Sequence, residues 1–120
     1  MNERGNLFEG IETGAGGEGE WFDPLLRHGP VRVERIVSHG HCSKMGFWYE
    51  QDEPEWVLVV SGHARLRLAN PDEVVALDPG DWLYLPPLRQ HRVEWTTPDE
   101  PTVWLAVWPG ADGGEMTGEG

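Results

Sequence analysis

The chain has 120 residues, which suits one domain, because two domains of half that length could not each bury a useful core. Its 21 acidic and 9 basic side chains give a formal net charge of −12, and a chain this acidic repels phosphate backbones, which disfavours nucleic-acid binding. No apolar run approaches the roughly 18 residues of a transmembrane helix, and no basic amphipathic stretch suits a membrane surface. The first residues lead into no apolar run, and Cys42 is the only cysteine. We therefore expect no secretory signal, no intramolecular disulfide and a cytoplasmic location.

The two ends of the chain are rich in Gly and acidic residues. We expect residues 1–20 to form a flexible acidic segment, in which a formal GxGxxG match at Gly14, Gly16 and Gly19 is a linker, since no strand precedes it. Residues 21–27 are expected to form a short helical turn packed on the domain. Residues 111–120 are expected to form a disordered tail. This places the folded domain at 21–110.

Between these segments, apolar residues recur with a period close to two, which is typical of half-buried strands. In residues 64–69, for example, Ala64, Leu66 and Leu68 alternate with Arg65 and Arg67. Turn signals rich in Pro, Gly, Asp and Asn separate the runs, and no ten-residue segment carries a helical stripe. The strands are predicted at 31–38, 46–51, 56–61, 64–69, 74–77, 82–85, 91–95 and 102–108. The pattern predicts an all-β fold, either a closed barrel or a double-sheet jelly roll.

Two segments resemble the paired motifs of the cupin superfamily. The first motif ends with a Glu, six further residues and then a Gly. In this chain the Glu is Glu55 and the Gly is Gly62. The second runs Gly, five residues and Pro, with a His five positions further on, which are Gly80, Pro86 and His91. The resemblance implies a cupin-type jelly-roll β-barrel of about eight or more short antiparallel strands. It also implies a homodimer, because cupins often pair through their outer sheets.

The chain departs from the family pattern where metal ligands are expected. Metal-binding cupins carry His-x-His shortly before the motif Glu, whereas the corresponding positions here are Tyr49 and Gln51, or Trp48 and Glu50 in the other register. We prefer the first register because it matches the commoner bacterial spacing. The resemblance then leaves Glu55 of the first motif, and the histidine of the second, in their usual places.

A candidate site follows if Gln51, Glu55 and His91 converge inside the barrel, with Tyr49 on the same strand face as Gln51. One interpretation is a metal-free, hydrogen-bonded pocket that binds a small molecule. A second is that Gln51, Glu55 and His91 hold one divalent ion (Zn, Fe, Mn or Ni), and the resemblance then implies a lyase, isomerase or dioxygenase. A third is metal-free acid–base catalysis by Glu55 and His91, with Tyr49 as a donor. The substrate stays open in all three.

A literal His-x-His also occurs as His39, Gly40 and His41, followed by Cys42. We interpret it as a polar loop, because Gly40 marks a turn and no fourth zinc ligand follows at a regular spacing. Either histidine could lean over the barrel mouth and replace a missing ligand. Cys42 has no identifiable base nearby, which argues against a nucleophile.

Overall fold

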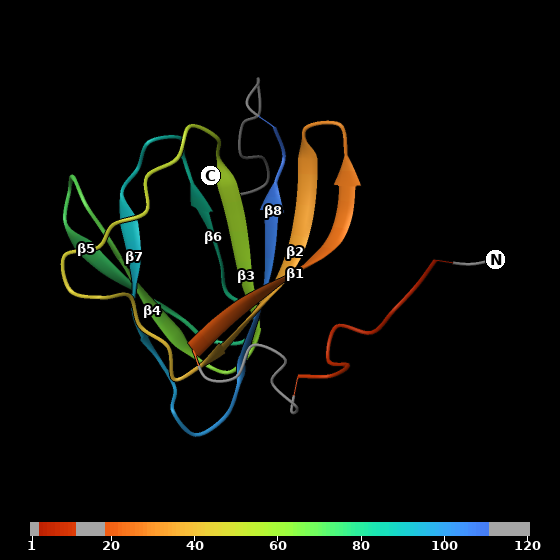
Figure 1. Cartoon of the computed structure of the whole chain (residues 1–120). Coiled ribbons are helices and arrows are strands. Elements are labelled where there is room, and N and C mark those ends of the chain that lie inside the picture. The colour runs from red at the N-terminus through yellow and green to blue at the C-terminus, as the bar shows by residue number, and fades with distance from the viewer. Residues whose placement is uncertain (1–2, 12–18, 111–120) are drawn as a thin grey trace.

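The structure, a computed structural model, describes residues 3–11 and 19–110 and consists there of strands, turns and loops (Figure 1). Its eight strands are β1 (Gly19–His28), β2 (Val31–His39), β3 (Glu55–Ser61), β4 (Ala64–Leu68), β5 (Glu73–Leu77), β6 (Trp82–Leu85), β7 (His91–Thr96) and β8 (Thr102–Trp108). Seven of the eight predicted strands are confirmed, with ends that differ by one residue at most. Within these ranges, no helix is long and apolar enough to cross a bilayer.

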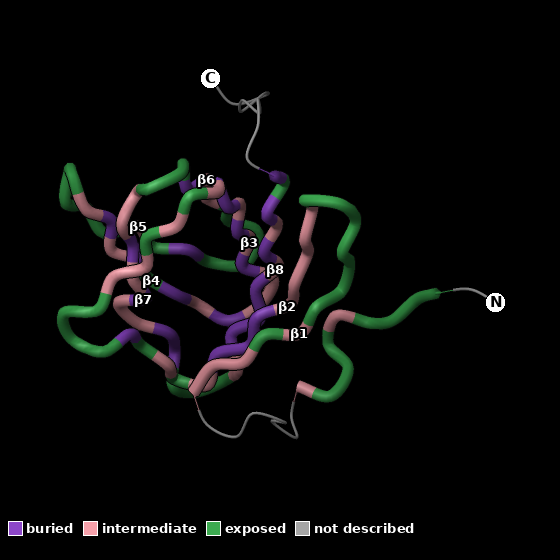
Figure 2. Tube along the Cα trace, turned by 45° about the horizontal axis from the view of Figure 1, so that its top comes forward, coloured by how far each residue is buried: buried purple, intermediate pink, exposed green. Residues whose placement is uncertain are grey.

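The strands form two antiparallel sheets that face each other. The larger has the order β1-β2-β8-β3-β6, and the smaller has the order β5-β4-β7 (Figure 1). Side chains from both sheets meet between them, including Val59 of β3, Leu66 of β4 and Trp104 of β8. Figure 2 shows the same division, with buried segments along the inner strands and exposed turns at the periphery. This is the predicted jelly-roll architecture, in which alternate side chains of each strand point into the space between the sheets.

The helical turn expected at residues 21–27 is wrong, because this segment lies inside β1. β1 pairs with β2 from Gly19 opposite His39 to His28 opposite Val31, so a β-hairpin replaces the turn. Pro24 suggested a break in regular structure, but β1 is the edge strand of its sheet. An edge strand tolerates proline, whose missing N–H takes no ladder partner, and the register shifts next to Pro24.

The strand expected at residues 46–51 is also wrong. Only Tyr49 pairs, in an isolated bridge to His91. A turn precedes it, closed by a hydrogen bond from Phe47 N to Lys44 O at 3.0 Å, and Met45 is 95% exposed. This segment is therefore a loop that crosses the end of β7. The tail expected at residues 111–120, and Gly14 and Gly16 of the glycine run, lie outside the described residues.

Candidate functional site

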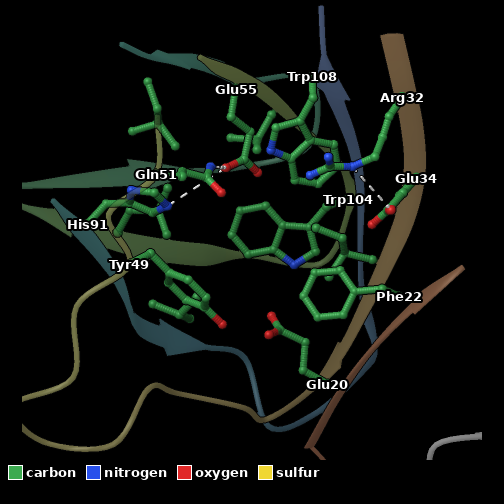
Figure 3. Close-up of a pocket in the computed structure, with 15 residues that line it drawn as sticks. Glu20, Phe22, Arg32, Glu34, Tyr49, Gln51, Glu55, His91, Trp104 and Trp108 are labelled. Carbon is green, nitrogen blue, oxygen red and sulfur yellow. Dashed lines mark hydrogen bonds and ion pairs between the residues drawn. The ribbon is translucent and has the colours of Figure 1, made fainter. Parts of the chain in front are cut away.

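A cavity of about 210 Å³ lies between the two sheets (Figure 3). Its apolar wall comes mainly from inward-facing residues of the larger sheet, and its polar lining comes from β1, β2, β3, β7 and the 46–51 loop. All four residues of the predicted pocket reach it. The lining residues are Glu20, Phe22, Arg32, Glu34, Ile36, Tyr49, Gln51, Glu55, Val57, Leu66, Leu85, His91, Val93, Trp104 and Trp108.

Glu55 opens β3 and is buried against the cavity wall, with 7% of its surface exposed. The Gln51 side chain donates from Nε2 to Glu55 Oε1 at 2.8 Å. The loop holds Gln51 in place, because its carbonyl oxygen accepts a hydrogen bond from Leu88 N at 2.8 Å. Leu88 has a φ of 68°, a backbone conformation that favours glycine. The carboxyl group thus keeps one oxygen bonded and the other directed to the cavity.

His91 opens β7 and faces Glu55, with 3.8 Å between His91 Nε2 and Glu55 Oε1. Its other ring nitrogen, Nδ1, lies 3.2 Å from the carbonyl oxygen of Arg89. A carbonyl oxygen can only accept, so Nδ1 carries the proton and Nε2 presents a lone pair to the cavity. Tyr49 stacks on the imidazole, with ring centroids 5.4 Å apart and planes 21° apart. The ring orientation is therefore fixed from two sides.

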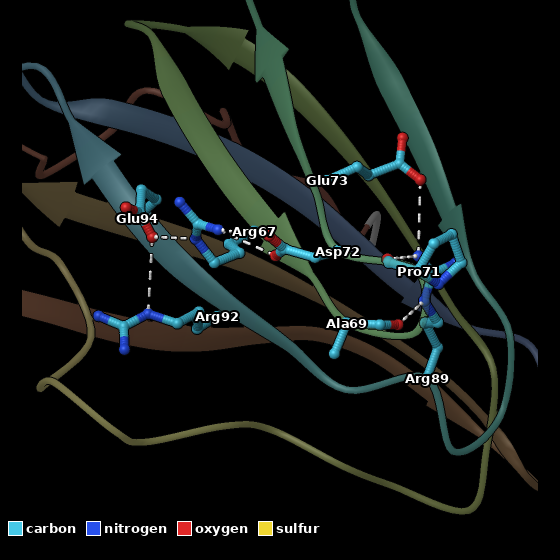
Figure 4. A network of polar contacts seen from close by, with 8 residues as sticks. All are labelled: Arg67, Ala69, Pro71, Asp72, Glu73, Arg89, Arg92 and Glu94. Carbon is cyan, nitrogen blue, oxygen red and sulfur yellow. Dashed lines mark hydrogen bonds and ion pairs between the residues drawn. The ribbon is translucent and has the colours of Figure 1, made fainter.

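Arg89 anchors the segment that carries His91 (Figure 4). Its Nε donates to the carbonyl oxygen of Ala69 at 2.5 Å, and its terminal nitrogen donates to that of Pro71 at 2.9 Å. Both acceptors lie in the turn between β4 and β5. Since the Arg89 carbonyl in turn accepts from His91, this guanidinium positions the imidazole through the backbone.

Burial shifts the two facing groups toward their neutral forms. It raises the pKa of Glu55 to about 7, an effect that the hydrogen bond from Gln51 and the charge of Arg32 oppose. Burial lowers the pKa of His91 below its ordinary value, against the hydrogen bond to the Arg89 carbonyl. Just below neutral pH, a largely protonated carboxyl group therefore faces a neutral imidazole.

Sequence reasoning missed part of the lining. Glu20 falls in the segment expected to be flexible, yet it accepts a hydrogen bond from Ser38 Oγ at 3.2 Å, and burial raises its pKa. Strand alternation could have found it, since Glu20 and Phe22 point the same way in β1. His41 Nε2 lies 3.5 Å from Glu20 Oε1 and so touches the lining without joining it. His39 stacks on Trp21, outside the cavity, and Cys42 is exposed.

The metal expected from the family requires a sufficient donor set. Catalytic metal sites in proteins usually supply three ligands, typically imidazole, carboxylate or thiolate. Among residues 3–11 and 19–110, no group of three or more His, Cys, Asp or Glu side chains is placed to hold an ion. Glu55 and His91 provide two such groups, and Gln51 turns its amide nitrogen, which cannot ligate, toward the carboxylate. As arranged, these residues do not fit a resident metal ion.

Comparison with known proteins gives the family. The family model described as Cupin domain matches residues 38–108, more than half of the chain, which therefore belongs to the cupin family.

The relatives include proteins named as sugar-phosphate isomerases. A crystal structure from Ralstonia eutropha JMP134, provisionally named a mannose-6-phosphate isomerase, is 44% identical, with a TM-score of 0.85 over 92% of this chain and 100% of that one. Glucose-6-phosphate isomerase of Pyrococcus horikoshii is 31% identical over 97 residues, 78% of this chain and 48% of the relative. The chain thus spans about half the length of the curated relatives it matches. A cupin 2 domain-containing protein from Halorhodospira halophila is 22% identical, with a TM-score of 0.65 over 78% of this chain and 66% of that one, and shows the fold alone.

Proposed function

We propose that this cupin binds a small organic molecule between its sheets and moves a proton on it with Glu55 and His91. The observation that carries the proposal is the buried pair itself, a carboxyl group with a pKa of about 7 and an imidazole 3.8 Å away. A general acid or base works best when its pKa lies near the working pH. Buried ionisable pairs with shifted pKa values gather at functional sites. Their burial costs stability, so such pairs persist where function requires them.

The geometry leaves His91 Nε2 and one oxygen of Glu55 free for a ligand. At 3.8 Å, Glu55 Oε1 and His91 Nε2 are too far apart to share a hydrogen bond, so neither group uses up the hydrogen-bonding capacity of the other. A ligand atom can contact both. In the neutral state, the pair offers one acid, the Glu55 carboxyl group, and one base, the His91 Nε2 lone pair.

The reaction class that this pair suits is isomerisation of a hydroxy-carbonyl compound. His91 Nε2 takes the proton from the carbon beside the carbonyl group while Glu55 gives its proton to the carbonyl oxygen, which forms an enediol. Glu55 then takes the proton from the other oxygen, and His91 returns its proton to the former carbonyl carbon. Both side chains end as they began. The names of the relatives as isomerases support this class.

Exchange of substrate hydrogen with solvent tests the proposal directly. The purified protein is incubated in D₂O with D-mannose, D-fructose or their 6-phosphates, and proton NMR follows deuterium incorporation at the carbons beside the carbonyl group. We expect incorporation with at least one probe, reduced by about 10²–10⁴-fold in Glu55→Gln and in His91→Asn. The chain offers a matched control in His63, which faces Asp78 at 2.9 Å in an exposed pair. His63→Asn should retain exchange. No incorporation with any probe, or equal rates in all variants, would contradict the proposal.

A further inference from the structure

The cavity lining holds more acidic than basic side chains. Glu20, Glu34 and Glu55 line it, whereas Arg32 is the one Lys or Arg among the lining residues that the structure describes. A dianionic phosphate needs cationic side chains or a cluster of backbone N–H donors to replace its hydration. The lining therefore offers a phosphate group at most one guanidinium.

That guanidinium is already engaged. Arg32 donates to Glu53 Oε1 at 2.9 Å, and its Nε lies 3.6 Å from Glu34 Oε2. Its guanidinium carbon lies 4.1 Å from the ring centroid of Trp108, over the indole face. Two carboxylates and an aromatic ring thus share the charge of Arg32. Recruitment of Arg32 by a phosphate would break these contacts and bring the phosphate next to Glu34.

Trp108, by contrast, has a buried N–H donor without a hydrogen-bond acceptor among the described residues. The residue is 5% exposed, lines the cavity, and its Nε1 has no hydrogen-bond partner among the described residues. Figure 3 places this nitrogen on the side of the indole ring that faces Gln51 and Glu55. A buried N–H without an acceptor costs free energy, so an indole fixed in this way points to an acceptor that a ligand supplies. The stacked Arg32 keeps the ring in place.

The size of the cavity limits the ligand. Its volume is about 210 Å³. Pockets for drug-sized ligands begin at about 300 Å³. The part of a ligand that the cavity encloses is therefore small.

We propose that the cavity selects a small, uncharged polyhydroxylated carbonyl compound that lacks a phosphate, with an acceptor oxygen on Trp108 Nε1 and hydroxyl groups on Glu20 and Glu34. This inference rests on the proposed function of the cavity and names its ligand class. It separates this chain from the relatives whose names include a sugar phosphate.

Binding measurements with paired probes test the charge selection. Calorimetric titration of the full chain compares D-mannose with D-mannose 6-phosphate, and D-fructose with D-fructose 6-phosphate. We expect each free sugar to bind at least about tenfold more tightly than its phosphate. In the double variant Glu20→Gln, Glu34→Gln, the difference in affinity between each free sugar and its phosphate should be smaller. The control Asp99→Asn, Glu100→Gln removes two charges from the exposed loop after β7 and should leave the difference unchanged. A phosphate that binds as tightly as its sugar, or a wild-type protein that binds neither sugar, overturns the inference.

The role of Trp108 has its own test. Trp108→Phe keeps an aromatic ring under Arg32 and removes the N–H, so D-mannose should bind about tenfold more weakly. Trp82→Phe changes a half-exposed ring that packs on Trp56 outside the cavity and should bind as wild type does. In the wild-type protein, the indole N–H resonance of Trp108 should shift on titration with D-mannose, a readout that does not depend on how well the variant folds. A resonance that stays in place while the sugar binds overturns the assignment.

The outcomes separate this inference from the function on which it rests. Free sugars that bind selectively but exchange no hydrogen with solvent leave the ligand class standing and contradict proton transfer by Glu55 and His91. Hydrogen exchange confined to the 6-phosphates would support proton transfer and overturn the ligand class.

Discussion

At the residue scale, Glu55 links the stability of the protein to pH. Its pKa is about 7 in the folded chain against an ordinary value of 4.5. The carboxyl group is protonated in both states below pH 4.5. Between that pH and about 7 the folded state binds more protons, so stability falls as the pH rises. The full loss, reached above pH 7, is on the order of 3 kcal/mol. The group thus weakens the fold in the pH range where the proposed chemistry operates.

Glu55→Gln removes this pH dependence while Gln keeps an acceptor oxygen for Gln51. We therefore expect the free energy of unfolding of the variant, taken relative to that of wild type, to rise by about 3 kcal/mol as the pH goes from about 4 to about 8. Urea unfolding at a series of pH values measures the difference. Glu100→Gln, at an exposed position, is the control for loss of one charge. A difference between Glu55→Gln and wild type that stays constant with pH would show that Glu55 is not the source.

The same two groups set the pH dependence of turnover. The proposed reaction begins with protonated Glu55 and neutral His91. The rate of hydrogen exchange should therefore fall above about pH 7, as Glu55 ionises, and fall again in acid below the lowered pKa of His91. A bell-shaped profile of kcat/KM is expected, with its maximum below pH 7, between the pKa of His91 and that of Glu55. A rate that keeps rising above pH 8 would assign the acid role to another group.

Much of this site could be predicted from sequence because motif spacing encodes the position of a residue on its strand. The resemblance of the two motifs leads to the hypothesis that Gln51, Glu55 and His91 converge inside the barrel, and in the structure all three line one cavity. Glu20 and Trp108 were missed for different reasons. Glu20 sits among glycines, where composition indicates flexibility. Trp108 is one of seven tryptophans, and only the packing shows which indole lacks a hydrogen-bond acceptor.

At the element scale, the connection between β3 and β4 depends on Gly62, which closes the first motif. Gly62 has a φ of 85°, and a Cβ built on it would lie 2.6 Å from the Cα of Thr102. Gly62→Ala should lose about 1–2 kcal/mol to the backbone conformation and a further 1–3 kcal/mol or so to the overlap. Gly80→Ala is the matched control, since Gly80 has a φ of 95° and open space around it. Chemical denaturation measures the loss of unfolding free energy in each variant, and we expect the larger loss in Gly62→Ala. Equal losses in the two variants would show that contact with Thr102 carries no cost.

Two of the predicted elements are wrong because their structure depends on which strands lie beside them. Residues 46–51 contain three aromatic residues, which favour strands, but a strand needs a neighbour along its length, and this loop meets β7 at a single pair of residues. Residues 21–27 contain Pro24, which breaks regular structure inside a sheet but not at an edge. Whether a segment forms an edge, a loop or an inner strand depends on which strands lie beside it. That information is tertiary, and periodicity does not contain it.

At the scale of the whole molecule, the net charge has the same sign as an ionised carboxylate of the cavity lining. A net charge of −12 disfavours anionic ligands at long range, and the carboxylates of the lining disfavour them at contact. Salt separates the two effects, because screening lengths shorten from about 30 Å at 0.01 M to about 3 Å at 1 M ionic strength. Raising salt over this range should narrow the preference for D-mannose over D-mannose 6-phosphate without abolishing it. Loss of the whole preference would place its origin outside the cavity.

Metal removal tests the whole fold together with its site. An ion bound only by the folded chain stabilises it, by about 2.7 kcal/mol at a hundredfold excess over Kd, which shifts the Tm of a domain of this size by more than about 10 °C. Two metal-binding side chains and an amide turned the wrong way do not supply such binding. Dialysis against EDTA should therefore leave both the Tm and the hydrogen exchange rate unchanged, and added Zn, Fe, Mn or Ni should not raise either. If EDTA lowers both, and one of these ions restores them in wild type but not in Gln51→Ala or His91→Ala, then Gln51, Glu55 and His91 bind a metal and the acid–base proposal is wrong.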